Sequence, residues 1–231
     1  MDFFKAGIYV INLDRRPERY NDFCNRLQLK KDLVKRVSAI DGLTLQIPKN
    51  LFIRNKFAYA CRLSHIKIMK DIIDNDEIKE NDYALIFEDD AFFVNNFITK
   101  FESYIEQIKE LEEEETLIYI GGRFIEDFNI PTQEKDLLFE KININLYLKK
   151  RNIFQKIGSD YWRDRTTNVL IYNKKACRKI VEISERSNQD IEIDTFLNWI
   201  YCKDNKVKVY DLLPHLVYSP INYLTDIQDK K

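Results

Sequence analysis

Short apolar runs bounded by polar residues predict the strands of this chain. The clearest runs from Tyr83 to Phe87, carries no charge, follows Asn81-Asp82 and leads directly into Glu88-Asp89-Asp90. An uncharged run of this length is typical of a strand buried on both faces, as in a parallel sheet. Comparable runs predict further strands over residues 6–13, 33–40, 116–122, 166–172 and 207–211.

Apolar residues spaced three or four positions apart predict helices between these strands. The helical patterns begin near Pro17, Phe57, Phe97, Ala176 and Phe196. Because strands and helices alternate, the sequence predicts an α/β fold with a mainly parallel central sheet and flanking helices. Neither an internal repeat nor a linker is apparent, so residues 1–231 are predicted to form a single domain.

Two segments fall outside this alternation. Residues 123–165 have no clear periodicity, and a long irregular stretch in a compact domain is usually functional or flexible. We therefore predict that they form an insertion facing the substrate. Residues 213–231 contain Pro214 and Pro220 and are predicted to form an extended tail that wraps around the domain.

Composition narrows the function classes. The net charge of -1 gives no electrostatic reason to expect nucleic acid as a partner. No apolar stretch is long enough to span a bilayer, and no N-terminal signal segment is apparent. The four cysteines are scattered without paired spacing, which predicts buried free thiols in a reducing compartment. We therefore expect a cytoplasmic protein, and these features are compatible with a viral or a bacterial source.

The three carboxylates after the central strand are the main candidate for chemistry. Glu88, Asp89 and Asp90 fall where ligands bind in open α/β sheets, at the carboxyl end of a strand. Adjacent carboxylates repel one another, and a divalent cation such as Mn²⁺ or Mg²⁺ would offset their charge. A solvated acidic turn after the strand is the alternative interpretation.

Three other positions each allow a functional and a structural interpretation. The first strand meets a helix start flanked by Arg15, Arg16 and Arg19, which suits a phosphate or forms an ordinary charged surface. His65 falls within an apolar helical stripe, where a hydrogen-bonded core histidine is common. Asp194 stands where a helix N-cap is expected.

Several motifs, taken in order, resemble glycosyltransferase family 25, which includes lipopolysaccharide and lipooligosaccharide sugar transferases and collagen galactosyltransferases. The motifs are residues 10–19 (VINLDRRPER), 39–42 (AIDG), 61–65 (CRLSH), 85–91 (LIFEDDA), 167–176 (TNVLIYNKKA) and 193–197 (IDTFL). Ala60 stands where the family usually has glycine, and the family's glutamine near the last strand is not evident around Tyr218-Ser219.

The resemblance implies a GT-A type fold and an inverting, metal-dependent enzyme. Such an enzyme moves a hexose, galactose or glucose, from a UDP-sugar to a hydroxyl of a glycan or of hydroxylysine. The implied metal is Mn²⁺ or Mg²⁺, held by Asp90 with Asp89. Residues implied near the nucleotide-sugar are Asn12, Asp14, Arg16, Asp41, Ser64, His65, Glu88 and Asp89. Asp194 is the implied catalytic base, and His215 and Asp226 are candidates for a third metal ligand.

Two other classes of function stay open from the sequence. One is a metal-dependent nucleotidyltransferase or phosphohydrolase, which also uses carboxylates at strand ends. The other is an inactive module that binds a nucleotide-sugar. The chain has no Gly-Lys-Ser/Thr phosphate loop, which argues against P-loop chemistry.

Overall fold

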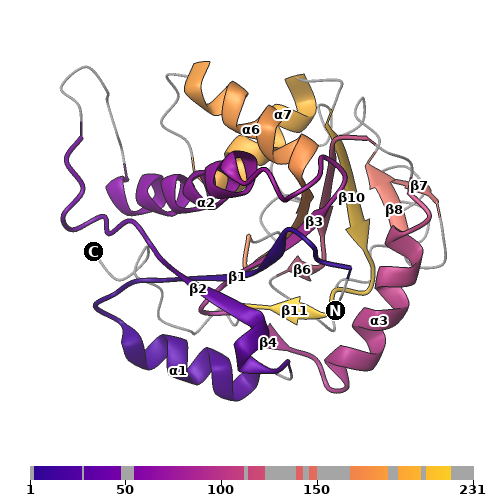
Figure 1. Ribbon diagram of the computed structural model, residues 1–231, viewed down its shortest axis with the longest axis horizontal. Helices are drawn as coiled ribbons and strands as arrows, with labels where there is room; N and C mark the ends of the chain where they lie inside the picture. Colours follow the sequence, from indigo (N-terminus) through magenta and orange to yellow (C-terminus); the bar gives the residue numbers. More distant parts are fainter. Residues whose placement is uncertain are drawn as a thin grey trace.

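One mixed sheet of eight strands crosses the centre of the protein (Figure 1). The computed structural model describes residues 3–27, 29–47, 55–111, 114–122, 139–142, 146–149, 167–186, 192–203 and 207–219. The strands of the sheet are β1 (Gly7–Asn12), β2 (Val34–Ser38), β3 (Tyr83–Glu88), β5 (Thr116–Tyr119), β7 (Phe139–Lys141), β8 (Leu146–Lys149), β9 (Val169–Asn173) and β10 (Lys208–Leu212). Their order is β2-β1-β3-β9-β5-β10-β8-β7.

Six of these described strands run in one direction, and β9 and β8 run against them. The predicted α/β class with a mainly parallel sheet is therefore confirmed. The reversed strand β9 lies between β3 and β5. Its first residues consequently lie beside the carboxyl end of β3, with Val169 opposite Phe87.

Helices cover both faces of the sheet (Figure 1). On one side lie α2 (Lys56–Asp74), α6 (Lys174–Arg186) and α7 (Ile193–Lys203), and on the other lie α1 (Pro17–Arg26) and α3 (Phe97–Ile108). A short 3₁₀ helix spans Lys31–Leu33. Within the described chain, every helix falls short of the length and hydrophobicity that crossing a bilayer requires.

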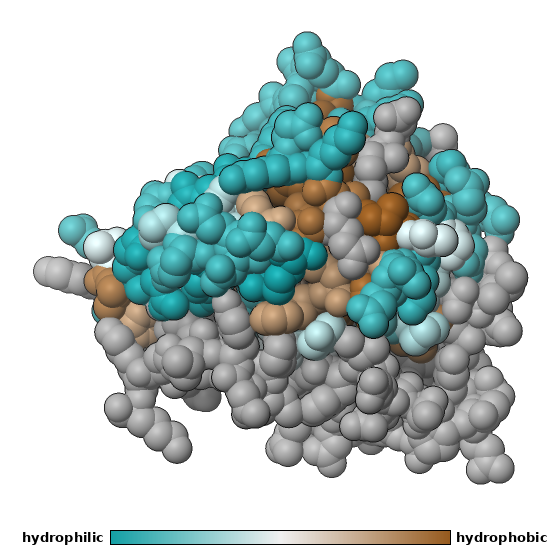
Figure 2. Space-filling model, turned by 90° about the horizontal axis from the view of Figure 1, so that it is seen from below, coloured by the Kyte–Doolittle hydropathy of each residue, from teal (hydrophilic) through white to brown (hydrophobic). Residues whose placement is uncertain are grey.

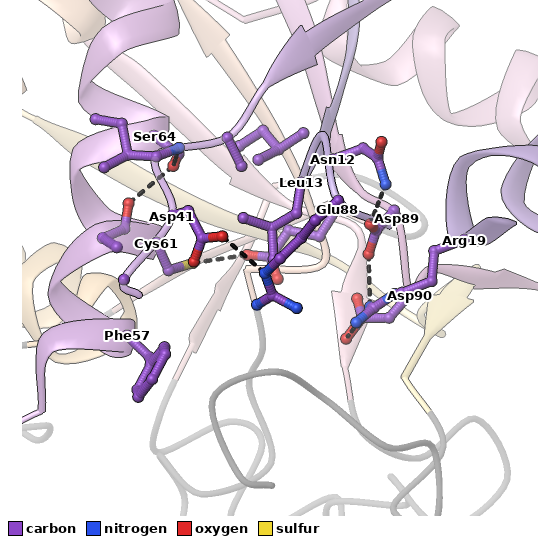
Figure 3. A pocket seen from close by; sticks show the side chains of 16 residues that line it. Asn12, Leu13, Arg19, Asp41, Phe57, Cys61, Ser64, Glu88, Asp89 and Asp90 are labelled. Atoms are coloured by element: carbon purple, nitrogen blue, oxygen red, sulfur yellow. Dashed lines mark hydrogen bonds and ion pairs between the residues drawn. The ribbon is translucent and has the colours of Figure 1, made fainter. Parts of the chain in front are cut away.

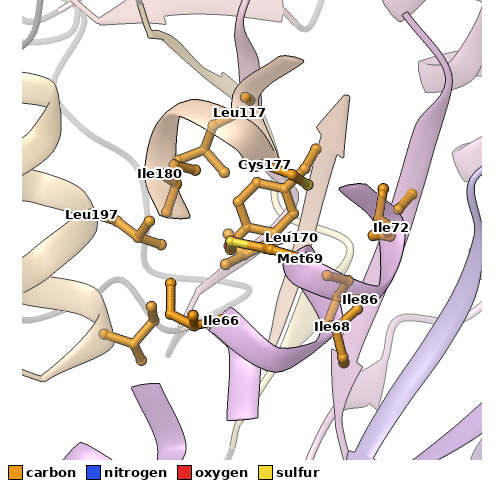
Figure 4. Close-up of a cluster of buried hydrophobic side chains, with 14 of the residues drawn as sticks. Ile66, Ile68, Met69, Ile72, Ile86, Leu117, Leu170, Cys177, Ile180 and Leu197 are labelled. Carbon is orange, nitrogen blue, oxygen red and sulfur yellow. The ribbon is translucent and has the colours of Figure 1, made fainter. Parts of the chain in front are cut away.

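The central strand β3 is buried from both sides, as its uncharged sequence predicts. Ala84 and Ile86 pack into the core beneath α2, α6 and α7 (Figure 4). Leu85 and Phe87 alternate with them and pack into the opposite core beneath α1 and α3. Burial of apolar area on both faces stabilises this strand by roughly 1.5–3 kcal/mol per large side chain.

A smaller sheet lies beside the end of β3. It consists of β4 (Phe92–Phe93), β11 (Val217–Tyr218) and β6 (Gly121–Gly122) in the order β4-β11-β6. The predicted strand over residues 116–122 is therefore divided between two sheets. The division falls at Ile120, whose carbonyl accepts hydrogen bonds from Leu216 and Val217.

Parts of the two irregular segments are described. Residues 139–141 and 146–149 form β7 and β8 at the edge of the large sheet, so the predicted insertion contributes strands of its own. Of the predicted tail, residues 213–219 hold β11, and residues 220–231 lie outside the described chain. The orientation of the insertion towards a substrate stays a prediction.

The prediction that all cysteines are buried is only partly correct. Cys177 is a buried free thiol, whereas Cys24 and Cys61 are free thiols that are partly exposed. The side chain of Cys202 lies outside the described part of the structure. Cys61 borders a pocket, and Cys24 lies on α1, whose outer residues face solvent. In a view from below, hydrophilic side chains cover much of the described surface and hydrophobic ones appear between them (Figure 2).

Candidate active site

The ends of the parallel strands β2, β1 and β3 border one pocket (Figure 3). It is lined by Ile11, Asn12, Leu13, Arg15, Arg19, Ala39, Ile40, Asp41, Gly42, Phe57, Ala60, Cys61, Ser64, Glu88, Asp89 and Asp90. Figure 3 shows Asp89, Asp90 and Arg19 together on one side and Phe57 with Asp41 on the other. The pocket therefore has one wall with Asp89, Asp90 and Arg19 and another that combines Phe57 with Asp41, at the position where α/β sheets bind ligands.

Local sequence features position these walls. Pro17 stands at the first position of α1, where its missing N–H removes no helical hydrogen bond, and the helix then carries Arg19 to the charged wall. Asn55 caps α2 by accepting hydrogen bonds from the backbone of Phe57 and Ala58. Gly42 allows Phe57 to approach, since a Cβ there would lie 2.6 Å from the Phe57 ring.

Asp89 is held tightly by two neighbours. Its Oδ1 lies 2.5 Å from the Arg19 guanidinium, and its Oδ2 accepts a 2.7 Å hydrogen bond from Asn12. The Asp89 carbonyl also accepts a hydrogen bond from Arg26. Because Asn12 ends β1 and Asp89 follows β3, these contacts join two strand ends and the start of α1.

Asp90 has a different environment. Its side chain is 10% exposed, its Oδ2 lies 3.9 Å from Arg19, and its Oδ1 has no hydrogen-bond partner among the described residues. Burial and the nearby charge of Glu88 raise the pKa of Asp90 to about 7, although Arg19 opposes the shift. A hard cation would stabilise the negative charge of a carboxylate that is buried in this way.

Glu88 turns one carboxylate oxygen, Oε1, towards α2 and the start of β9. Its Oε1 accepts a 2.6 Å hydrogen bond from Thr167 and lies 3.0 Å from His65 Nε2 and 3.7 Å from Cys61 Sγ. Burial would raise the pKa of Glu88, but the contacts with His65 and Thr167 outweigh it and lower the pKa. These side chains are close enough to ligate an ion, yet hydrogen bonds account for their arrangement.

Asp194 lies beside this cluster. Its Oδ1 is 3.0 Å from the hydroxyl of Thr167. Burial, followed by the charge of Glu88, raises the pKa of Asp194 to about 7. The helix α7 begins at Ile193, so Asp194 lies inside the first turn. The expectation that Asp194 occupies the N-cap position is therefore wrong by two residues, because the N-cap position is that of Glu192.

The sequence-predicted nucleotide residues divide into two groups. The pocket is lined by Asn12, Asp41, Ser64, Glu88 and Asp89. Asp41 pairs with Arg15 at 2.7 Å, and Ser64 Oγ accepts a hydrogen bond from the backbone of Ile40. In this way Ser64 holds the pocket wall in place.

The remaining predicted residues do not line the pocket. Asp14 accepts hydrogen bonds from Arg36 and Ser38, and Arg16 pairs with Glu18 on the surface. His65 is fully buried behind Glu88, so it supports the wall without forming it.

The structure describes one of the two candidates for a third metal ligand, His215. His215 is buried, 3.7 Å from Asp211 in the turn after β10, and does not line the pocket. Asp226 lies outside the described residues. His215 therefore adds no ligand to the pocket, and Asp226 stays a prediction.

Sequence reasoning did not single out Thr167 or Phe57 as site residues. Thr167 precedes β9, and the sequence did not predict that β9 runs antiparallel to β3. Because β9 is antiparallel, its first residues lie at the carboxyl end of β3, and Thr167 therefore meets Glu88. Phe57 was recognised only as part of an apolar helical stripe. Its place after a capping asparagine and opposite Gly42 is the signal that could have marked it.

An α/β sheet with a carboxylate-bearing pocket at the ends of adjacent parallel strands defines a ligand-binding protein of the α/β class. The chain belongs to glycosyltransferase family 25, because the family model described as "Glycosyltransferase family 25 (LPS biosynthesis protein)" matches residues 5–197. The matched span includes every residue of the pocket and Asp194. The resemblance noted from the motifs is thereby confirmed.

Among curated proteins, the chain is similar to procollagen galactosyltransferase 2 of mouse and of human. The identities are 29% and 31% over 132 residues, which cover 50% of this chain and 20% of each relative. The chain therefore spans about a fifth of the length of the curated relatives it matches.

Two solved structures are similar to the chain over most of its length. A putative glucose-1-phosphate thymidylyltransferase from Bacillus anthracis is 14% identical with a TM-score of 0.39, covering 91% of this chain and 70% of that one. The galactosyltransferase LgtC, in complex with donor and acceptor sugar analogs, is 11% identical with a TM-score of 0.35, covering 88% and 72%. At these identities and TM-scores the two likenesses carry no argument about this chain.

Proposed function

We propose that the protein is an inverting, metal-dependent hexosyltransferase that moves galactose or glucose from a UDP-sugar to a hydroxyl of a glycan or of hydroxylysine. The observation that carries this proposal is the buried Asp90 carboxylate, whose Oδ1 has no partner among the described residues, beside Arg19 in the pocket. Family membership supports a sugar transfer, and the names of the procollagen relatives support galactose.

The residues present fit a divalent cation. Mn²⁺ and Mg²⁺ prefer hard oxygen ligands, and Asp90 offers such an oxygen in a buried position. Asp90 is the main candidate ligand, and Asp89, already bound to Arg19 and Asn12, is the second. When bound, the ion would supply Lewis-acid stabilisation of the negative charge on the departing diphosphate.

The protein's own groups account for the other requirements. Arg15 and Arg19 line the pocket, each paired with an aspartate, and their guanidinium groups are of the kind that binds a diphosphate. The ring of Phe57, which lies against Gly42, forms an apolar surface suited to a nucleobase. The residues thus divide the pocket between the two halves of a nucleotide.

Asp194 is the proposed general base. The acceptor oxygen bonds to the anomeric carbon as the bond from that carbon to UDP breaks, and the acceptor proton passes to the Asp194 carboxylate. Displacement from the face opposite the leaving group inverts the anomeric configuration. A base of this kind contributes about 10²–10⁴-fold to the rate, and a carboxyl whose pKa is about 7 is suited to the task at neutral pH.

Product analysis tests the proposal. Incubation with a panel of UDP- and GDP-sugars and Mn²⁺ should release UDP from UDP-galactose or UDP-glucose, and EDTA should abolish the release. Asp90→Asn should remove the Mn²⁺ dependence of UDP binding. Asp22→Asn is the matched control, because Asp22 is exposed on α1.

Each alternative predicts a different result. Release of UMP would indicate a pyrophosphate-cleaving nucleotidyltransferase or phosphohydrolase. Thermal stabilisation by UDP-sugar without any turnover would indicate an inactive binding module. Undiminished transfer in EDTA would overturn the metal dependence.

A further inference from the structure

One threonine hydroxyl lies between two carboxyl groups from different elements. Thr167 Oγ1 is 2.6 Å from Glu88 Oε1 at the end of β3 and 3.0 Å from Asp194 Oδ1 in the first turn of α7. Thr167 is 4% exposed, so bulk water does not compete for these contacts. Its place is fixed by the adjacent backbone, because the Asn168 carbonyl accepts a hydrogen bond from Glu88 N.

The number of protons constrains this arrangement. A hydroxyl has one proton to donate and can accept others, so Thr167 cannot donate to two ionised carboxylates at once. With Asp194 protonated, Asp194 donates to Thr167 and Thr167 donates to Glu88. With Asp194 ionised, the hydroxyl rotates and donates to Asp194 instead, while Glu88 keeps its contacts with His65 Nε2 and Cys61 Sγ.

The surroundings of Asp194 make this second state costly without the hydroxyl. Glu88 and Glu192 oppose its negative charge, whereas His65 and Thr167 favour it. The titratable groups that face Asp194 are Glu88 from β3, Cys61 and His65 from α2, Tyr172 from β9 and Glu192 beside α7.

A second contact anchors α7, the helix that carries Asp194. Phe196, two residues along α7, lies under the Arg62 guanidinium, 3.7 Å from it, and Arg62 also donates to Ser184 of α6. The backbone of α7 is thus anchored to α2 and α6. The rotation of the carboxyl group itself depends on Thr167.

We propose that Thr167 is a positioning residue for sugar transfer: its hydroxyl aims the Asp194 carboxyl and stabilises the ionised form that accepts the proton of the attacking hydroxyl. This inference rests on the proposed function and assigns a role to a residue outside the pocket lining. Thr167 acts through Asp194 and touches no substrate.

The test compares Thr167→Val, which keeps the shape and loses the hydroxyl, with Thr167→Ser, which keeps the hydroxyl. Thr116→Val is the matched control, since Thr116 is also a fully buried threonine whose hydroxyl makes a hydrogen bond, to the Glu114 backbone. UDP release from UDP-galactose with Mn²⁺ is measured from pH 5 to pH 9. Carboxyl ¹³C NMR follows the titration of Asp194, assigned with Asp194→Asn.

In Thr167→Val we expect kcat to fall by about 10-fold or more, which is the usual effect of one hydrogen bond to a charged group. KM for UDP-galactose should stay within about two-fold, since the pocket lining is unchanged. The acidic limb of the kcat profile and the NMR titration should both move up by about one pH unit. Thr167→Ser should restore both, and Thr116→Val should alter neither.

Wild-type kcat and an unmoved Asp194 titration in Thr167→Val would overturn the inference, as would equal losses in Thr167→Ser and Thr167→Val. If Thr167→Val does not fold, Thr167→Ala against Thr167→Ser makes the same comparison. An inactive wild-type protein would instead refute the proposed function, and the NMR titration would still decide whether Thr167 controls the Asp194 proton.

Discussion

Arg19 and Asp89 form a buried ion pair, with 2.5 Å between the guanidinium Nη2 and the carboxylate Oδ1 and side-chain exposures of 8% and 10%. Arg19 belongs to α1 and Asp89 follows β3, so the pair joins the covering helix to the central strand. Removal of one partner would leave the other charge buried without compensation, which is the costly way to break an ion pair.

Arg19→Met should therefore lower the free energy of unfolding by about 3–5 kcal/mol. The matched control is Arg178→Met, because Arg178 pairs with Glu80 at 2.8 Å on an exposed surface and its loss should cost under about 1 kcal/mol. Urea unfolding followed by circular dichroism measures both. Equal losses in the two variants would mean that the buried pair does not stabilise the fold.

The carboxyl of Asp194 should make stability depend on pH. Burial, then Glu88, raises its pKa from 3.8 to about 7 in the folded state, so between these values the folded state binds more protons than the unfolded state. Stability from this group is fully present below pH 4 and is lost as pH rises towards 7, at no more than about 1.4 kcal/mol per pH unit. Urea unfolding at a series of pH values gives the free energy of unfolding as a function of pH. In Asp194→Asn this free energy should change less between pH 4 and 7, and an unchanged slope against pH would contradict the prediction.

Glycine at position 42 should determine the width of the pocket. A Cβ there would lie 2.6 Å from the Phe57 ring and 2.9 Å from the Phe57 backbone, so Gly42→Ala should displace the start of α2 and weaken UDP binding by about 10-fold, measured by calorimetry. Gly7→Ala is the control, because Gly7 has a φ of 106° and meets only the side chain of Tyr9. It should lower stability while leaving UDP affinity unchanged, and a similar affinity loss in both variants would count against a local effect.

Arg62 should not tolerate lysine. Its guanidinium lies 3.7 Å from the Phe196 ring centre and donates to Ser184, and an ammonium cannot reproduce a flat stacked contact. Arg62→Lys should lower the free energy of unfolding by about 1–2 kcal/mol, whereas Arg178→Lys at the surface should have little effect. The melting temperatures of the two variants measure this difference. Equal melting temperatures would contradict the prediction.

Much of the fold was predictable because burial of an element determines where apolar and charged residues occur along its sequence. The run from Tyr83 to Phe87 lacks charge because both faces of β3 are covered, and the carboxylates after it therefore fall at the sheet edge. The α1 stripe with Phe23 followed from helical spacing, and Phe23 does pack against Phe87. Local sequence is sufficient for such features because each depends on one element and the face that it buries.

The contacts around Asp194 were not predictable in the same way. An apolar run has the same sequence whether its strand runs parallel or antiparallel, so nothing near Val169 indicated that β9 is reversed. A parallel β9 would have carried Thr167 to the opposite edge of the sheet, away from Glu88. Likewise, the spacing of His65 gave no sign of whether it faces the pocket or supports Glu88 from behind.

The insertion of β9 between β3 and β5 also has a consequence for biosynthesis. Residues 83–88 of β3 and 116–119 of β5 are synthesised well before residues 169–173 of β9, so β3 and β5 cannot be joined in the sheet until β9 has been made. The later β11, at residues 217–218, must then enter between β4 and β6. During translation the nascent chain therefore exposes unpaired strand edges, which chaperones commonly protect, and the contacts of Thr167 with Glu88 and Asp194 form late.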